Sequence, residues 1–282
     1  MDPDLLRYLQ EDVGAGDITT MALAGHERAE ADVVAKAAGV VCGLAEAAQV
    51  FAHLGARAEA RTHEGARVKP DEVVLRVEGP AAAVLTGERL ALNLLMRMSG
   101  IATATAAIQA KIAAVNPLCR VAATRKTTPG FRKLEKRAVE VGGGDPHRFG
   151  LFDAFLVKDN HLLVEPDVAR AVQRCRAAKP GAFLQVEADR PEQALAAAEA
   201  GADGVLLDNF TPQQALDAYR VLKGRWPRLL VEVSGGVTPE NVAAYAQAAD
   251  RVSMGWITHS APALDFGLDV TRVGNLRSPQ QT

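Results

Sequence analysis

The feature that most constrains the fold is a repeated unit in the second half of the chain, where short apolar segments alternate with helical ones. The alternation begins near residue 117, and each apolar segment ends in a charged or hydrogen-bonding residue. This pattern predicts parallel strands joined by right-handed helical crossovers, which means a barrel or a doubly wound sheet. The predicted strands cover residues 121–125, 153–158, 183–187, 204–208, 229–234 and 251–255.

The polar strand ends favour the barrel. The last five of them are Lys158, Glu187, Asp208, Ser234 and Gly255. They are separated by 29, 21, 26 and 21 residues, which suits one strand and one helix each. Ends with this spacing would surround one cavity, as at the mouth of a (β/α) barrel, although any single charge could simply meet solvent. Because only six or seven strands can be counted, the predicted barrel is incomplete.

The first 100 residues lack this alternation. A helix is expected near residues 3–11, and two extended pieces on either side of Gly39 indicate a bent strand or a hairpin. A second helix is expected over residues 44–54, followed by antiparallel strands. Residues 91–112 are apolar on more than one face, which predicts a buried helix pair broken near Ser99 and Gly100. A length of 282 residues fits two domains at about 150 residues each.

Composition excludes several classes of protein. The 32 basic and 34 acidic residues give a net charge of −2, without the basic excess of proteins that bind nucleic acid non-specifically. Three widely spaced cysteines indicate neither a disulfide framework nor a zinc knuckle. The N-terminus lacks the pattern of a secretory signal, and no apolar run approaches the ~18 residues of a membrane span. We therefore expect a cytoplasmic protein whose partners are neither nucleic acids nor membranes.

The local charge differs from the total. Seven basic residues and one acid lie between residues 120 and 137, a local excess of +6. The helical spacing after Gly130 predicts that most of the later members form an exposed helix face. Arg125 and Lys126 differ, since they close an apolar strand and precede a turn rich in hydroxyls. A glycine-rich loop then presents His147 and Arg148, so this region could bind an anion.

Glu187 and Asp208 oppose this positive set from adjacent strand ends. The pair could bind a divalent metal, hold sugar hydroxyls or take part in acid–base chemistry. The plainer alternative is that the two acids neutralise Lys158 and Arg125. The glycine-containing ends at residues 234–236 and 254–255 lie where barrels often bind phosphate. The combination indicates a phosphorylated sugar that meets a carboxylated second substrate.

Motifs along nearly the whole chain resemble those of the quinolinate phosphoribosyltransferase family. The N-terminal ones are EDVGAGDITT and GERLALNLLMRMSGIAT. The others are TRKTTPG (124–130), GGGDPHRFGL (142–151), DAFLVKDNH (153–161), GADGVLLDN (201–209), VEVSGGVTPEN (231–241) and SMGWITHSAPALDF (253–266). The resemblance implies transfer of phosphoribose from phosphoribosyl pyrophosphate to quinolinate with decarboxylation. The expected products are nicotinate mononucleotide, pyrophosphate and CO₂, in de novo NAD biosynthesis.

The resemblance also implies an architecture. We expect an α/β sandwich over residues 1–110, an incomplete barrel of about seven strands over 111–270, and a tail, 271–282, that packs on the first domain. The expected assembly is a homodimer with shared active sites, in which the N-terminal domain of one subunit covers the barrel mouth of the other. Arg89 would reach into the neighbouring site.

Residue roles follow from the same resemblance. Cationic residues would hold quinolinate, two lysines would lie between the two substrates, two acids would bind ribose hydroxyls and Mg²⁺-pyrophosphate, and glycine-containing loops would take the 5′-phosphate. The predicted catalytic residues are Lys126, Lys158, Glu187 and Asp208, of which Glu187 and Asp208 contact the metal indirectly. The predicted substrate-binding residues are Arg89, Thr124, Arg125, Lys126, His147, Arg148, Lys158, Glu187, Asp208, Ser234, Gly235, Gly236, Gly255, Trp256, Ile257, Thr258 and His259.

Two alternatives stay open. One is a paralogous phosphoribosyltransferase of the same fold that uses another acceptor, and the other is a non-catalytic anion-binding barrel. The first would be expected to lack the full set of TRKTTPG, the His-Arg pair and the lysines, and the second to lose Lys126, Lys158, Glu187 or Asp208. All of these are present here. The chain departs from the family pattern at Gln185, where the family often has another acid, and at Trp256, a bulky residue in the predicted phosphate loop.

Overall fold

The structure, a computed structural model, describes residues 1–275 and divides them between two units, each with its own sheet. Unit 1 contains residues 1–104 together with the described residues from 261 onward, and unit 2 is Thr105–Ser260. The predicted boundaries after residues 110 and 270 differ from these. The later boundary differs because β12 (Phe266–Asn275) pairs with a strand of unit 1. Residues 276–282 of the predicted tail lie outside the described residues.

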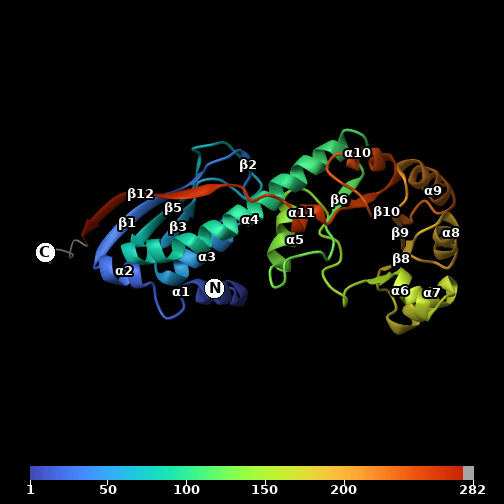
Figure 1. Cartoon of the computed structure of the whole chain (residues 1–282), viewed down its shortest axis with the longest axis horizontal. Coiled ribbons are helices and arrows are strands. Elements are labelled where there is room, and N and C mark those ends of the chain that lie inside the picture. Colours follow the sequence, from blue (N-terminus) through green and yellow to red (C-terminus); the bar gives the residue numbers. More distant parts are fainter. Residues whose placement is uncertain (276–282) are drawn as a thin grey trace. The chain divides into compact units, whose positions relative to one another are not determined.

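Unit 1 is an α/β layer structure. Its four-stranded sheet has the order β12-β1-β5-β3, and all of its pairings are antiparallel. Helix α3 and the first half of α4 pack on one face of this sheet (Figure 1), where Phe51 and Leu95 join Val33, Leu75 and Val77 in one buried cluster. The elements besides β12 are α1 (Pro3–Val13), α2 (Ile18–Leu23), β1 (Glu27–Ala35), β2 (Gly39–Val40), α3 (Leu44–Leu54), β3 (Arg57–Ala60), β4 (Arg67–Val68), β5 (Val73–Pro80) and α4 (Ala81–Ala113).

Helix α4 is one continuous helix of 33 residues, so the predicted break near Ser99 and Gly100 is wrong. Gly100 serves close packing, because a Cβ there would lie 2.1 Å from the carbonyl oxygen of Pro262. Ser99 holds the segment around Cys42 against the helix. Its hydroxyl accepts a hydrogen bond from the backbone amide of Cys42 and donates one to the carbonyl of Cys42. The helix is long and apolar enough to cross a membrane, but 67% of its most apolar stretch is buried, as in a core helix.

The extended pieces around Gly39 are confirmed as strands, but they do not form a hairpin. Strand β1 pairs with β12 and β5, whereas β2 pairs with β4. The amide of Val40 donates to the hydroxyl of Thr103 on α4 at 2.8 Å. The second piece is therefore held against the helix instead of folding back on the first.

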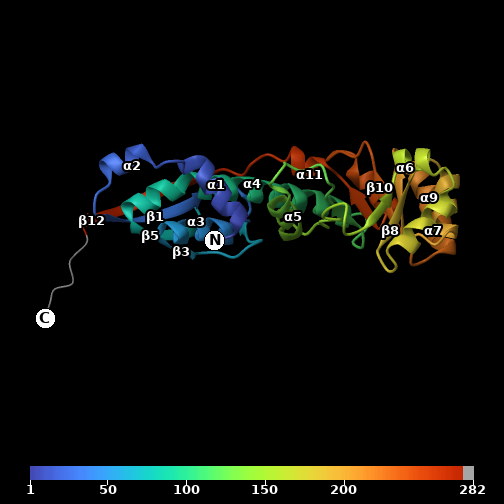
Figure 2. The ribbon, with the colours of Figure 1, turned by 90° about the horizontal axis from the view of Figure 1, so that it is seen from below.

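Unit 2 contains a parallel six-stranded sheet with the order β6-β11-β10-β9-β8-β7. Helices α7 and α9 lie on the same face of this sheet in both views (Figures 1 and 2). The strands are β6 (Arg120–Ala122), β7 (Phe155–Val157), β8 (Leu184–Ala188), β9 (Gly204–Asp208), β10 (Leu230–Ser234) and β11 (Arg251–Ser253). The helices are α5 (Arg132–Val141), α6 (Asp159–Val164), α7 (Val168–Ala178), α8 (Pro191–Glu199), α9 (Pro212–Arg225), α10 (Val242–Tyr245), the 3₁₀ helix η1 (Ala246–Ala248) and α11 (Trp256–His259).

The barrel-like sheet is incomplete, as predicted, but it has six strands where about seven were expected. A single parallel bridge between Ala122 and Asp145 stands in the place of a seventh strand beside β6. Pro146 follows Asp145 and has no amide N–H, so it cannot extend the ladder. Strand β7 forms the opposite edge of the sheet.

Candidate active site

The carboxyl ends of the parallel strands in unit 2 carry most of the predicted site residues. Lys158 directly follows β7, and Glu187 is the last residue but one of β8. Asp208 ends β9 and Ser234 ends β10, and these two residues pair in register. The fold therefore gathers the two acids, Lys158 and Ser234 at one rim of the sheet.

Glu187 and Lys158 form a hydrogen-bonded ion pair between their side chains. The Glu187 side chain is 10% exposed, whereas that of Lys158 is 42% exposed. Burial and then the charge of Glu187 raise the pKa of the Asp208 carboxyl, against the opposing charges of Lys158 and Lys126. The other three predicted catalytic residues thus all act electrostatically on Asp208. Neutralisation of Lys158, the plainer alternative, occurs through Glu187.

The two acids line a cavity of about 670 Å³ in unit 2. Asp159, Asp189 and Asn209 contribute to the same wall. Asn209 has a left-handed backbone, with φ of 58°, and its side-chain amide donates to Asp208 at 2.7 Å. The cavity therefore presents several oxygen atoms beside the paired lysine.

Lys126 lies against the loop that follows β11. A Cβ added at Gly255 would lie 2.9 Å from Cδ of Lys126 and 3.1 Å from the ring of His259. The hydroxyl of Thr258 donates to the carbonyl of Lys126 at 2.8 Å, and the amide of Lys126 donates to Thr124 at 3.0 Å. The loops after β6 and β11 are thereby joined, and Lys126 is placed over Gly255.

Arg125 and Arg148 lie close enough in unit 2 for their charges to interact. Burial and then the charge of Arg125 lower the pKa of the Arg148 guanidinium, whereas Asp153, Glu232 and Glu187 act in the opposite direction. Two guanidinium groups held within electrostatic reach of each other suit a ligand with more than one negative charge. Neither Arg125 nor Arg148 forms an ion pair with Glu187 or Asp208 among residues 1–275.

His147 is turned toward the interior. Its side chain is 9% exposed, and Nε2 lies 3.2 Å from a carboxylate oxygen of Glu232. The other ring nitrogen, Nδ1, accepts a hydrogen bond from the backbone amide of Arg148 at 2.7 Å. Both nitrogens of the predicted ligand-binding histidine are therefore occupied by protein groups.

The glycines of the predicted phosphate loop are required by its geometry. Gly235 and Gly236 both have left-handed backbones, with φ of 85° and 61°. A Cβ at Gly235 would lie 2.3 Å from the side-chain oxygen of Asn209. Glycine at residue 235 therefore allows the backbone of the loop after β10 to approach the end of β9 more closely than a residue with a side chain could.

Residues 256–259 form the single helical turn α11. Ile257 and Thr258 are fully buried, so their side chains face the interior of unit 2. Trp256 is half-buried and His259 is exposed, with its Nδ1 at 2.6 Å from the hydroxyl of Ser260. Of this predicted set, only Trp256 and His259 offer side chains to a ligand.

Helix α5 buries one of its four basic residues, Lys136, while Arg132, Lys133 and Arg137 stay partly or fully exposed, as was predicted for most of them. Lys136 is 3% exposed, and its ammonium group donates to the carbonyl oxygen of Pro146. Burial and then the charge of Arg132 lower the pKa of Lys136 to about 8. Helical spacing alone suggested a solvated charge, but the loop that follows α5 covers this side chain and uses it.

Two family models match the chain. The model described as "Quinolinate phosphoribosyl transferase, C-terminal domain" matches residues 101–269, and the corresponding N-terminal domain model matches residues 17–99. The chain belongs to the quinolinate phosphoribosyltransferase family. It is therefore a phosphoribosyltransferase, and the fold and family resemblance expected from its motifs are confirmed.

Similar proteins match this phosphoribosyltransferase over most of their length. The probable nicotinate-nucleotide pyrophosphorylase [carboxylating] of Archaeoglobus fulgidus is 46% identical, over 90% of this chain and 98% of its own. The Rattus norvegicus nicotinate-nucleotide pyrophosphorylase [carboxylating] is 39% identical, over 96% and 91%. The crystal structure of NadC from Streptococcus pyogenes superimposes with a TM-score of 0.90 at 36% identity, covering 98% of this chain and 97% of that one.

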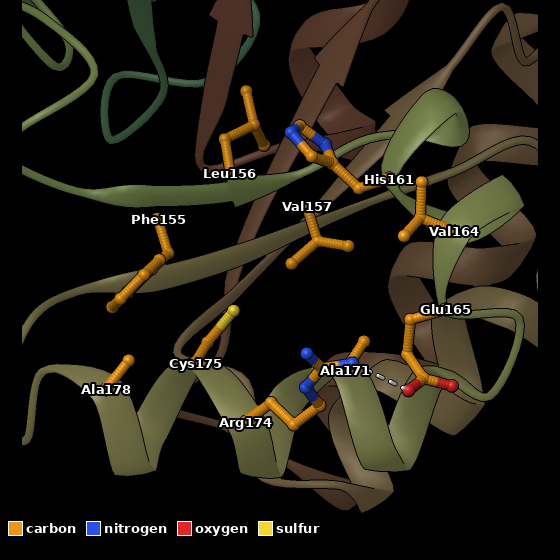
Figure 3. A pocket seen from close by; sticks show the side chains of 10 residues that line it. All are labelled: Phe155, Leu156, Val157, His161, Val164, Glu165, Ala171, Arg174, Cys175 and Ala178. Carbon is orange, nitrogen blue, oxygen red and sulfur yellow. Dashed lines mark hydrogen bonds and ion pairs between the residues drawn. The ribbon is translucent and has the colours of Figure 1, made fainter.

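Arg89 is the one predicted site residue of the phosphoribosyltransferase that lies in unit 1. It is on α4, its side chain is 59% exposed, and its nearest acidic partner, Glu88, is 3.9 Å away. Unit 2 has a second cavity, of about 490 Å³, between β7, α6 and α7. Figure 3 shows that apolar side chains such as Phe155 and Val157 point into it, while Glu165 and Arg174 pair at one side. None of the predicted site residues lines this second cavity.

The sequence interpretation missed three residues that contact the His147 loop of the phosphoribosyltransferase. They are Asp145, Glu232 and Arg251, and the Arg251 guanidinium forms an ion pair with each of the two carboxylates. One signal was available in the sequence. Glu232 interrupts the apolar segment of β10, and a charge in the middle of a buried parallel strand requires partners.

Proposed function

We propose that this phosphoribosyltransferase transfers the phosphoribosyl group of phosphoribosyl pyrophosphate to the ring nitrogen of quinolinate. CO₂ and pyrophosphate leave, and nicotinate mononucleotide, a precursor of NAD, is formed. The observation that carries the proposal is the meeting of opposite charges in unit 2. Lys158 pairs with Glu187, and both Lys126 and Lys158 act electrostatically on Asp208, at the carboxyl ends of adjacent strands.

Quinolinate has two carboxylates on neighbouring ring carbons. Arg125 and Arg148 lie close enough for their charges to interact, and planar guanidinium groups bind carboxylates through paired hydrogen bonds. We assign the two arginines to the two carboxylates. His147 contributes by holding the backbone of Arg148, because its own ring nitrogens are already bonded.

In the transfer step, the pyridine nitrogen forms a bond to the anomeric carbon while the bond from that carbon to pyrophosphate breaks. The leaving pyrophosphate takes the electron pair, and the ribose passes through an oxocarbenium-like state. Glu187 and Asp208 stabilise the positive charge that develops on the ribose and bind its hydroxyls. Lys126 and Lys158 stabilise the negative charge on the departing group, in a site where such charges are poorly screened.

Decarboxylation follows from the first step. Alkylation makes the ring nitrogen cationic, so the ring can hold the electron pair left when the adjacent carboxylate departs as CO₂. The ring carbon then takes up a proton. This chemistry requires no additional electron-accepting cofactor.

Mg²⁺ fits the acidic rim as an ion that arrives with phosphoribosyl pyrophosphate. Among residues 1–275, no group of three or more His, Cys, Asp and Glu side chains could hold a metal ion alone. Mg²⁺ commonly combines one or two carboxylates with substrate phosphates and water, and Glu187 and Asp208 supply such carboxylates. When bound, the ion neutralises charge on the pyrophosphate.

A homodimer with shared sites is the assembly that we propose. Arg89 supports it, because this exposed arginine belongs to unit 1, whereas the other predicted site residues all belong to unit 2. Helix α2 of the same unit exposes Ile18, Met21 and Leu23, each by more than 70%. Clustered exposed apolar side chains favour a protein contact. We expect the dimer to work in the cytoplasm.

The direct test is turnover by the purified protein with quinolinate, phosphoribosyl pyrophosphate and Mg²⁺. We expect nicotinate mononucleotide, pyrophosphate and CO₂ in equal amounts. Nicotinate should be a poor acceptor because it lacks one of the two carboxylates. Folded dimer that forms no product would overturn the proposal. Product from another acid, but not from quinolinate, would indicate the paralogous enzyme instead.

A matched pair of variants tests the arginine assignment. Arg125→Ala should raise the KM for quinolinate by about 100-fold, since a charged bidentate contact is lost. Arg220→Ala, at an exposed position on α9, should leave the KM unchanged. Equal KM values in the two variants would remove Arg125 from the quinolinate site.

A further inference from the structure

Glu232 is a fully buried carboxylate in the middle of strand β10. One of its oxygens accepts from Arg251 at 2.8 Å, from Gln185 at 3.0 Å and from His147 at 3.2 Å. The other oxygen accepts from the hydroxyl of Ser253. A buried charge is tolerated only when it is paired and hydrogen-bonded, and this one has donors from four residues.

The donors connect Glu232 to the loop after α5. Arg251 bridges two acids, since it also pairs with Asp145 at 2.9 Å. Asp145 accepts a hydrogen bond from the backbone amide of His147 at 2.6 Å. Glu232, Arg251, Asp145 and His147 therefore form a closed ring of contacts. The ring holds both the backbone and the side chain of His147.

His147 needs this support because its backbone is left-handed, with φ of 55°. A left-handed conformation is unfavourable for a residue with a Cβ, so it persists where the surroundings impose it. The imidazole accepts from the amide of Arg148 through Nδ1, which places its proton on Nε2, toward Glu232. The conformation of His147, and with it the start of Arg148, is thus set by the Glu232 carboxylate on β10.

The charges of the network are consistent with this arrangement. Burial raises the pKa of Glu232, but the hydrogen bond from His147 and the charge of Arg251 outweigh it and hold the pKa at about 2. Gln185 adds a donor without adding charge. A carboxylate in its place would put two acids at hydrogen-bond distance in a buried site, which the amide avoids.

We propose that Glu232 is a positioning residue for the reaction, and that it acts through Arg251, Asp145 and His147 to aim Arg148 at a carboxylate of quinolinate. Gln185 supports the same carboxylate as a neutral donor. The inference rests on the proposed function, since it assumes that Arg148 binds quinolinate. Its distinctive consequence is that loss of a buried side chain affects one substrate and spares the other.

The test compares Glu232→Met with Glu232→Gln in steady-state kinetics. Methionine removes the acceptor, so the KM for quinolinate should rise at least about tenfold, while the KM for phosphoribosyl pyrophosphate stays within about twofold. Glutamine can still accept from Arg251 and His147 through its oxygen and can donate to Ser253, so it should recover most of the affinity. Equal KM values for quinolinate in Glu232→Met and the wild type would overturn the inference.

Two further variants keep the test decisive. If Glu232→Met fails to fold, Asp145→Ala replaces it, because the Asp145 side chain is 31% exposed and its loss opens no buried cavity. The same selective rise in the KM for quinolinate is expected, and an unchanged KM would overturn the inference. Ser253→Ala is the control, since it removes a donor that is not connected to the loop, and a tenfold rise in that variant would also count against it. Inactive wild-type enzyme would refute the proposed function, whereas active enzyme with unselective variants would refute only the role of Glu232.

Discussion

Gly255 and Lys126 are in contact across two loops, and a methyl group at residue 255 would lie 2.9 Å from Cδ of the lysine. The backbone of Gly255 is helical, with φ of −66°, so alanine there causes no backbone strain. The substitution acts on Lys126 alone among the predicted catalytic residues.

Gly255→Ala is therefore predicted to displace Lys126 and to lower kcat by about 10- to 100-fold, because a small misplacement of a charged group weakens stabilisation of the transition state. Thermal unfolding should change little. Gly224→Ala is the control, since a Cβ at residue 224 meets no atom within 4 Å. Equal activity of the two variants would show that Lys126 does not need this contact.

The acid at residue 187 gives the second prediction. Glu187→Gln removes the charge that pairs with Lys158, and we expect kcat to fall by about 100-fold or more as stabilisation of the oxocarbenium-like state is lost. Asp189→Asn alters an exposed acid of the same cavity and should keep at least half of the activity. The comparison uses kcat of the two variants, measured with both substrates saturating. Similar losses of kcat in both would point to the overall charge of the cavity rather than to Glu187.

The sequence predicted the parts of this fold that depend on local pattern. Strand β9 lies at residues 204–208 as predicted, because its apolar residues, its final acid and the flanking polar residues all lie within one short segment. The unbroken helix α4 could not be predicted, since the chain that packs on Gly100 lies about 160 residues further on. Glycine at that point looks like a helix break until Pro262 is seen against it.

The candidate site likewise has residues that local sequence pattern could place and residues that it could not. Lys158 and Asp208 follow apolar strands, so topology alone brings them to one edge. The inward orientation of His147 depends on Glu232, 85 residues later in the chain, and no local pattern records such a contact. Which basic residue of α5 would be buried could not be predicted for a related reason, because helical spacing cannot show that a later loop will cover Lys136.

Lys136 gives a prediction about pH. Its pKa is lowered by burial from 10.5 to about 8, so between these two pH values the unfolded chain holds a proton that the folded chain has released. The contribution of Lys136 to the free energy of unfolding must therefore rise with pH across this window, and below pH 8 burial of its charge opposes folding. The free energies of unfolding of the wild type and of Lys136→Met, measured by chemical denaturation at several pH values, should show the wild type gaining stability relative to the variant between about pH 8 and pH 10.5. A constant difference between the wild type and Lys136→Met would contradict the assignment.

Arg89 gives the final prediction, which concerns the dimer. Arg89→Ala and Lys126→Ala are each expected to lose nearly all activity, because each removes a cation from the site that we propose the two subunits share. If Arg89 serves the site of the neighbouring subunit, a mixed dimer of the two variants has one site with both defects and one site with neither. Random exchange in an equal mixture makes half of the dimers mixed, so about a quarter of the wild-type activity should return. Exchange is followed independently by native mass spectrometry, and the absence of recovery in demonstrably mixed dimers would place Arg89 outside the shared site.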